Sequence, residues 1–119
     1  MPAKILIVDD EAVVREILSR QLAAWGHAVR IAASAEEALA LLERESVDAV
    51  LLDNVLTGMT GLQALAELRR RSPAPVLLMT GHSDPEFAKD ARLLGAADVF
   101  GKPLDAETLR LALDKALGL

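Results

Sequence analysis

The fold of this chain is decided by the stretch Ile5-Leu6-Ile7-Val8-Asp9-Asp10-Glu11, in which four apolar residues run directly into three acidic ones. An unbroken apolar run of this length is typical of a parallel strand that is covered on both faces. Comparable runs recur along the chain. The second run of the chain, residues 28–31, alternates more between apolar and polar residues, as an edge strand does. We therefore predict five strands, at residues 5–8, 28–31, 49–52, 76–79 and 98–100.

Each interval between these runs carries a helical pattern. Apolar residues recur at the spacing that places them on one face of a helix. Signals for helix starts and ends flank these patterns, including capping boxes, a proline at a first position and a glycine at an end. The apolar faces are Val14, Ile17, Leu18, Leu22 and Trp25 in the first helix, Leu62, Leu65 and Leu68 in the third, and Leu109, Leu113, Ala116 and Leu117 in the last; the signals are Ser34 with Glu37, Thr60 with Gln63, Asp84 before Pro85, and Gly95.

The order of these elements predicts the fold class, an α/β domain. Five strand–helix units follow one another with short connections, and neither a repeat nor a linker interrupts them. Such alternation predicts a doubly wound parallel sheet, because right-handed crossovers place helices on both of its faces. We expect residues 1–119 to form one domain of about the commonest size.

Composition narrows the class of protein. Apolar residues make up 52% of the chain and charged residues 26%, which is typical of a globular domain rather than a disordered segment. The absence of cysteine excludes disulfides, thiolate catalysis and cysteine–zinc sites. Two isolated histidines, His27 and His82, do not indicate a histidine-rich metal site.

Charge and hydropathy bear on location and partners. The first apolar run is too short for a secretory signal, and no segment approaches the roughly 20 apolar residues of a membrane-spanning helix. We therefore expect a cytoplasmic protein that does not contact a membrane. The net charge is −5, and the one basic cluster, Arg69-Arg70-Arg71, closes a helix, where cations suit the negative end of the dipole. We expect no direct contact with nucleic acid.

Polar residues follow four of the predicted strands. Ligands of an open parallel sheet bind beyond the carboxyl ends of its strands, so these residues should share one edge. Carboxylates gathered there would repel one another unless a cation lies between them, and Mg²⁺ prefers oxygen ligands. We predict that Asp9, Asp10 and Asp53 bind Mg²⁺. The full set is Asp9, Asp10 and Glu11; Asp53 and Asn54; Thr80, Gly81 and His82; and Gly101, Lys102 and Pro103.

The residues expected at this edge also indicate phosphoryl chemistry. A carboxylate beside Mg²⁺ can attack phosphorus, which would form an aspartyl phosphate at Asp53. Phosphoryl transfer requires positioning and charge stabilisation on the phosphoryl oxygens, which the Lys102 ammonium and the Thr80 hydroxyl would supply. Asp10 or Glu11 taken alone could equally cap the first helix, but the joint placement favours a phosphoacceptor site.

With these residues in place, the whole chain resembles the receiver domains of bacterial response regulators. The pair Asp9-Asp10 resembles the family's metal-binding pair, and Asp53 resembles its phosphoacceptor at the end of the third strand. Thr80 resembles its switch hydroxyl, and Lys102 opens a lysine–proline pair like the one that the family carries after its fifth strand. Five side-chain positions thus agree in type, order and strand context.

The resemblance implies further structural features. It implies a flavodoxin-like sheet of strand order 2-1-3-4-5 with five helices. It also implies that the backbone carbonyl of Val55 completes the metal shell, and that the Lys102–Pro103 bond is cis, a geometry that only X–Pro bonds adopt cheaply.

The resemblance implies partners and a response as well. Asp53 would take its phosphoryl group from a histidine kinase or a histidine phosphotransfer protein, so the domain would be a signalling phosphoacceptor and not an enzyme. Phosphate would draw Lys102 and Thr80 inward and change the surface of the fourth helix, fifth strand and fifth helix. That surface would face an output domain or a partner. The sequence leaves open whether the chain also forms a homodimer through the fourth and fifth helices. Val55 and His82 are placed to influence dephosphorylation.

Two positions depart from the family pattern. Thr57 stands where the family usually has proline, four residues after the acceptor. Val99 stands where many receivers carry a tyrosine or phenylalanine that turns inward with the threonine. The adjacent Phe100 occupies a position that is ordinarily a buried aliphatic one, so we do not expect it to substitute.

Two other functions stay open. One is a degenerate receiver that binds partners without phosphorylation, for which Val99 leaves room. The other is a magnesium-dependent phosphohydrolase of the haloacid-dehalogenase type, which uses an Asp-x-Asp pair. The sequence Asp53-Asn54-Val55 lacks the second carboxylate of that pair, and the chain lacks a cap insertion.

Overall fold

Five parallel strands form one sheet in the part of the chain that the structure, a computed structural model, describes: residues 3–54, 56, 58–81, 85–102 and 105–119. The strand order is β2-β1-β3-β4-β5, which confirms the predicted order. Each predicted strand is also confirmed, with one further residue at one end. The strands are β1 (Lys4–Val8), β2 (Ala28–Ala32), β3 (Ala49–Asp53), β4 (Val76–Thr80) and β5 (Asp98–Gly101).

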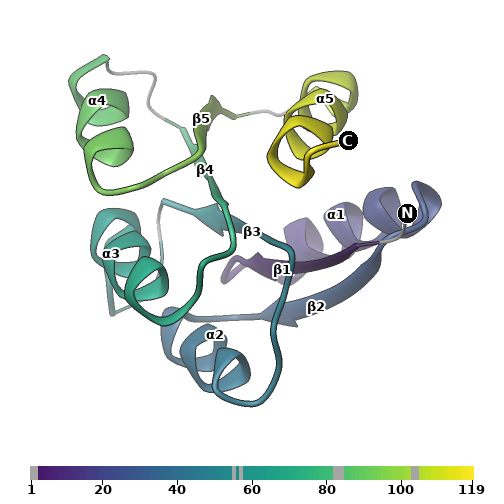
Figure 1. Cartoon of the computed structure of the whole chain (residues 1–119), viewed down its shortest axis with the longest axis horizontal. Helices are drawn as coiled ribbons and strands as arrows, with labels where there is room; N and C mark the ends of the chain where they lie inside the picture. The colour runs from purple at the N-terminus through teal and green to yellow at the C-terminus, as the bar shows by residue number, and fades with distance from the viewer. Residues whose placement is uncertain (1–2, 55, 57, 82–84, 103–104) are drawn as a thin grey trace.

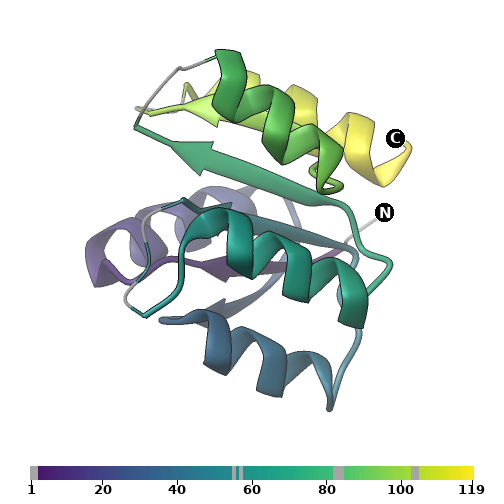
Figure 2. The same cartoon turned by 90° about the vertical axis from the view of Figure 1, so that its left-hand side faces the viewer.

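The described residues form five helices, one after each strand, as predicted. Two of them, α1 and α5, cover one face of the sheet, and α2, α3 and α4 cover the other (Figures 1 and 2). This two-sided cover is what right-handed crossovers in both directions along a sheet produce. The helices are α1 (Ala12–Ala24), α2 (Ala35–Leu42), α3 (Gly61–Arg71), α4 (Pro85–Leu93) and α5 (Ala106–Leu117).

Alternation along the central strands divides the described apolar core into two clusters. Successive side chains of a strand point to opposite faces. In β1, Leu6 and Val8 therefore pack with α2, α3 and α4, whereas Ile5 and Ile7 pack with α1 and α5. All four side chains are fully buried. Residues of the edge strand β2 are more exposed, in agreement with its alternating sequence.

The helix ends mostly confirm the signals in the sequence. The Ser34 hydroxyl accepts a hydrogen bond from the Glu37 backbone N–H at 3.1 Å. Thr60 and Gln63 form a full capping box before α3, with hydrogen bonds of 3.2 and 3.0 Å. Pro85 begins α4, and Gly95 follows its end at a φ of +105°, a conformation that favours glycine. Asp84 lies outside the described residues.

The predicted apolar face of α1 is wrong at Ile17, whose side chain is 60% exposed. Leu18 and Leu22 are buried as predicted, and Val14 and Trp25 are partly buried against the same cluster. Ile17 lies about 100° around the helix from Leu18. It therefore falls outside the arc of α1 that contacts the sheet.

Gly61 allows the start of α3 to lie directly against the end of β3. Its N–H donates a hydrogen bond to the Asn54 carbonyl oxygen at 2.8 Å. A Cβ added at residue 61 would overlap the Asn54 side-chain oxygen, and would lie 2.5 Å from the Asn54 Cα and 2.9 Å from its carbonyl oxygen. These distances leave no room for any side chain.

The Gly61→Ala variant is therefore expected to lose about 1–3 kcal/mol of unfolding free energy, because backbone atoms must move to admit the methyl group. Gly101→Ala is a matched control, because a Cβ at residue 101 would meet nothing within 4 Å. Urea unfolding of both variants would measure the difference. Equal stability of the two would contradict the close approach of α3 to β3.

Candidate functional site

The predicted site residues come from the carboxyl ends of four neighbouring strands. Asp9 directly follows β1 and Lys102 directly follows β5, whereas Asp53 and Thr80 are the last residues of β3 and β4. These four strands lie side by side in the sheet. Hydrogen bonds continue across the strand ends, from the Asn54 N–H to the Met79 carbonyl at 2.8 Å and from the Lys102 N–H to the Thr80 carbonyl at 2.7 Å. The backbone at this edge is therefore held in register.

Asp9, Asp10 and Asp53 form a cluster of carboxylates at this edge. Each offers one oxygen atom, and these atoms lie within 4.8 Å of one another. Asp9 is fully buried and Asp53 is 2% exposed, whereas Asp10 is exposed. The predicted metal-ligating side chains are thus brought together, with one of them open to solvent.

The Asp9 residue is held by three hydrogen bonds. Its backbone N–H donates to the Ala32 carbonyl at 3.1 Å, and its carbonyl accepts from the Arg15 guanidinium at 2.7 Å. Its side-chain Oδ1 accepts from the Glu11 N–H at 2.9 Å. The second side-chain oxygen, Oδ2, is buried and has no hydrogen-bond partner among the described residues. Buried polar atoms are normally paired, so this oxygen is suited to a ligand.

Lys102 supplies the positive charge at this edge. Its ammonium Nζ lies 2.8 Å from Asp53 Oδ1 and 3.9 Å from Asp9 Oδ2, with the lysine side chain 30% exposed. Burial lowers the pKa of Lys102, but the hydrogen bond that its ammonium donates to Asp53 and the charges of Asp53, Asp9 and Glu11 outweigh this effect and leave the pKa raised. Lys102 is therefore a cation at neutral pH.

Burial raises the pKa of Asp9, and the nearby Asp53 and Glu11 charges add to the rise, while the Glu11 N–H and the Lys102 charge oppose it. The ionised carboxylate is thus under-compensated by the protein alone. A divalent cation beside Oδ2 would remove that cost. The donor set fits Mg²⁺, which takes carboxylate oxygens and keeps several waters. Exposed Asp10 leaves space for such waters.

We expect Asp9→Asn to stabilise the metal-free protein at pH 7. A raised pKa means that the folded state holds the proton more tightly than the unfolded state does, so ionised Asp9 opposes folding above its ordinary pKa of about 3.9. The metal-free wild type should accordingly lose stability as the pH rises from about 3.9 through the raised pKa. Urea unfolding in EDTA would measure both effects.

The same variant should also lose the stabilisation that we expect Mg²⁺ to give to the wild type. Asp10→Asn is the matched control, because an exposed carboxylate carries little burial cost. Asp10→Asn should reduce the stabilisation by Mg²⁺ without making the metal-free protein more stable. If Asp9→Asn instead destabilises the metal-free protein, the burial cost assigned to Asp9 is wrong.

Thr80 lies beside the acidic cluster and is 2% exposed. The side-chain amide of Asn54 lies 3.5 Å from its hydroxyl oxygen, with Asn54 Nδ2 as the donor. The sequence placed both residues at strand ends but did not predict this contact. Only the three-dimensional pairing of β3 with β4 brings the two side chains together.

Several predicted residues lie outside the described part of the chain. These are Val55, whose carbonyl is expected in the metal shell, His82, which is expected to influence dephosphorylation, and Thr57 and Pro103. The roles assigned to them, and the cis bond before Pro103, stay predictions.

The neighbours Val99 and Phe100 in β5 point to opposite faces of the sheet. Val99 is partly buried among the residues that pack with α2, α3 and α4, and Phe87 of α4 packs against the same cluster. Phe100 is 8% exposed and belongs to the cluster with α1 and α5. Phe100 therefore lies on the wrong face to replace an aromatic residue at position 99, as predicted.

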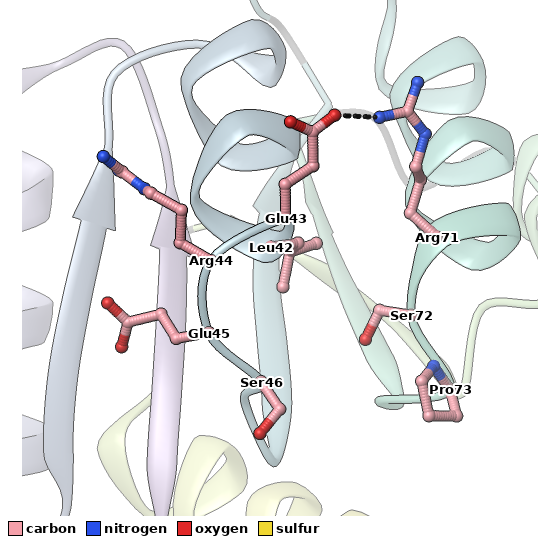
Figure 3. A pocket seen from close by; sticks show the side chains of 8 residues that line it. All are labelled: Leu42, Glu43, Arg44, Glu45, Ser46, Arg71, Ser72 and Pro73. Carbon is pink, nitrogen blue, oxygen red and sulfur yellow. Dashed lines mark hydrogen bonds and ion pairs between the residues drawn. The ribbon is translucent and has the colours of Figure 1, made fainter.

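The arginine cluster at the end of α3 is engaged within the protein. Arg69 donates to the Ala74 carbonyl at 3.0 Å, Arg70 to Glu67 at 3.0 Å, and Arg71 to Glu43 at 2.9 Å. Figure 3 shows the pocket between the ends of α2 and α3, where Arg71 reaches Glu43 while Arg44 points away from it. These cations do not converge on a common anion. This agrees with the interpretation that the cluster closes a helix, where cations suit the negative end of the dipole.

The fold and the edge cluster together define a class: a doubly wound α/β domain with carboxylates and a lysine gathered at the carboxyl ends of its strands. No helix within the described residues is both long and apolar enough to cross a membrane. A family model described as "Response regulator receiver domain" matches residues 5–114. The chain belongs to that family.

Curated and solved relatives agree with this assignment. The chain is 40% identical over 114 residues to the transcriptional regulatory protein ZraR of Escherichia coli (strain K12). This match covers 95% of the chain and 26% of that protein. The chain thus spans about a quarter of that relative's length. The structure of the Vibrio cholerae chemotaxis protein CheY4 superimposes with a TM-score of 0.91 at 32% identity, covering 98% of this chain and 100% of that one.

A third relative was solved in a modified state. It is a response regulator protein from Burkholderia pseudomallei, described as having a phosphorylated aspartic acid, a calcium ion and citrate. Its TM-score is 0.87 at 32% identity, and the match covers 97% of this chain and 68% of that chain.

Proposed function

We propose that Asp53 accepts a phosphoryl group beside a Mg²⁺ ion that is held by Asp9, Asp10 and Asp53. The observation that carries this proposal is the buried Asp53 carboxylate in contact with Lys102 at 2.8 Å, next to an Asp9 oxygen that has no hydrogen-bond partner among the described residues. Family membership supports the chemistry, and so does the phosphorylated aspartic acid of the Burkholderia relative.

The chain's own residues account for the transfer. An Asp53 oxygen forms the new bond to phosphorus while the bond between phosphorus and the donor breaks and its electron pair leaves with the donor. The Lys102 ammonium, held at this edge by two carboxylates, stabilises the charge on the phosphoryl oxygens. The Thr80 hydroxyl donates a further hydrogen bond to one of these oxygens. Bound Mg²⁺ would neutralise the carboxylates and the incoming phosphate.

The proposed donors are a histidine kinase or a histidine phosphotransfer protein. Phosphorylation adds about −1.5 to −2 charge, which would draw Lys102 and Thr80 toward Asp53 and alter the surface of α4, β5 and α5. We propose that this surface contacts an output module or a separate partner. Leu93 on α4 and Leu111 on α5 are 75% and 64% exposed, and a homodimer through these helices stays open.

The test is uptake of a phosphoryl group from acetyl phosphate, followed by intact mass. With Mg²⁺ present we expect the mass to rise by one phosphoryl group, and with EDTA in excess we expect no change. A rise that does not depend on Mg²⁺ would contradict the role of the acidic cluster.

The same experiment separates the proposal from the alternatives. No mass shift, together with no shift of amide resonances on titration with beryllofluoride, would favour a degenerate receiver that acts by binding alone. Steady turnover of a phosphomonoester would instead favour a phosphohydrolase. We expect neither, because the described edge carries an acceptor, a cation and a hydroxyl together.

A further inference from the structure

Asn54 connects three elements at the proposed phosphorylation site. Its backbone N–H donates to Met79 in β4, and its carbonyl accepts from Gly61 at the start of α3. Its side-chain amide lies 3.5 Å from the Thr80 hydroxyl oxygen. The residue next to the acceptor thus contacts the hydroxyl that phosphorylation would engage.

The Asn54 side-chain amide lies between the start of α3 and Thr80. Of the Asn54 atoms, the side-chain oxygen is the nearest to the space where a Gly61 side chain would begin. The amide nitrogen faces Thr80. An alanine at residue 61 would displace this side chain, so the absence of a side chain at Gly61 leaves the room that Asn54 occupies.

The direction of the hydrogen bond matters for the chemistry. An amide nitrogen can only donate, so Thr80 Oγ1 accepts from Asn54. A hydroxyl that accepts in this way can still donate its own hydrogen to another oxygen. The three oxygens of a phosphoryl group on Asp53 accept and never donate, so this is the hydroxyl orientation that they require.

We propose that Asn54 is a positioning residue that orients the Thr80 hydroxyl as a donor to the phosphoryl group on Asp53. The inference rests on the proposed function and adds a residue to it. The separation of 3.5 Å is long for a hydrogen bond in the unmodified protein, and such contacts commonly tighten once the reacting group is bound. Hydrogen bonds arranged in series also strengthen one another.

A double-mutant cycle with beryllofluoride, a non-covalent mimic of a phosphoryl group, tests this inference. The proteins are the wild type, Asn54→Leu, Thr80→Val and the double variant, each titrated with beryllofluoride in the presence of Mg²⁺ and followed by amide NMR. We expect Asn54→Leu to weaken beryllofluoride binding roughly 3- to 10-fold in the wild-type background. In the Thr80→Val background the loss should be less than about 2-fold, because the effect acts through Thr80.

Three controls keep the outcomes distinct. Asn54→Ala removes the same amide without adding a branched apolar group, so it should show the same coupling to Thr80. Mg²⁺ affinity without beryllofluoride should be unchanged in Asn54→Leu, because the substitution leaves the three carboxylates Asp9, Asp10 and Asp53 in place. An equal loss in both Thr80 backgrounds, or a parallel loss of Mg²⁺ affinity, would overturn the positioning role.

Failure of the proposed function would look different. If the wild type itself binds no beryllofluoride with Mg²⁺, the phosphoacceptor site is wrong. If the wild type binds it and Asn54→Leu binds it equally well, only the role of Asn54 is wrong.

Discussion

The Asp53→Asn variant is expected to take up no phosphoryl group from acetyl phosphate under conditions that convert the wild type. An ionised carboxylate oxygen is a nucleophile toward phosphorus, whereas the oxygen of a carboxamide is not, because its electron density is delocalised onto nitrogen. The side chains have nearly the same shape, and the carboxamide oxygen can still accept a hydrogen bond from Lys102. Intact mass with Mg²⁺ present would measure the loss.

An exposed aspartate of α4 provides the matched control. Asp90→Asn removes the same charge from the surface and should be phosphorylated like the wild type. Uptake by the Asp53→Asn variant at the wild-type rate would show that another residue is the acceptor. Correct folding of the variant can be checked separately by its amide NMR spectrum.

The Lys102→Met variant should lose roughly 10²- to 10³-fold in the rate of phosphoryl uptake, the usual effect of removing one charged or hydrogen-bonding group that stabilises developing charge. Methionine keeps an unbranched apolar stem of similar length and removes the ammonium that lies 2.8 Å from Asp53. The rate of mass increase with acetyl phosphate at saturating Mg²⁺ would measure the effect.

The same variant should bind Mg²⁺ at least as tightly as the wild type does. Lys102 already neutralises part of the charge of Asp9 and Asp53 in the metal-free protein, so its ammonium competes with a metal ion for these carboxylates. Slower uptake combined with undiminished Mg²⁺ affinity distinguishes a lost catalytic charge from general damage. Lys89→Met, at an exposed lysine of α4, should change neither quantity. A parallel loss of Mg²⁺ affinity in Lys102→Met would contradict this account.

The sequence predicted most of the fold because a parallel sheet that is covered on both faces leaves a plain pattern. Apolar runs such as residues 5–8 gave each strand to within one residue, and the capping box at Thr60 gave the start of α3. Periodicity alone could not supply the strand order, which came from the family resemblance. It also failed at Ile17, because helical spacing does not say how wide an arc of α1 the sheet covers.

The candidate site could be predicted only in part. Parallel strands bring their carboxyl ends to one edge, so the gathering of Asp9, Asp53, Thr80 and Lys102 followed from the order of elements. The hydrogen-bond partner of each side-chain atom could not be predicted in this way. That Asp9 Oδ2 has no hydrogen-bond partner among the described residues, and that Asn54 meets Thr80, depend on side-chain packing between neighbouring elements that no local pattern records.

The proposed site lies at one end of the strands, and the opposite end is available for protein engineering. The proposed chemistry gathers at the carboxyl ends of the strands, whereas Glu45, near their opposite ends, forms ion pairs with Lys4 and Arg30. Ser46 lies in the connection before β3, at that opposite end, and is exposed. Exposed loop positions of this kind tolerate insertions best. A reporter domain inserted there would sit at the far ends of the strands from the proposed acceptor, Asp53, so it would leave the proposed site open to a phosphodonor.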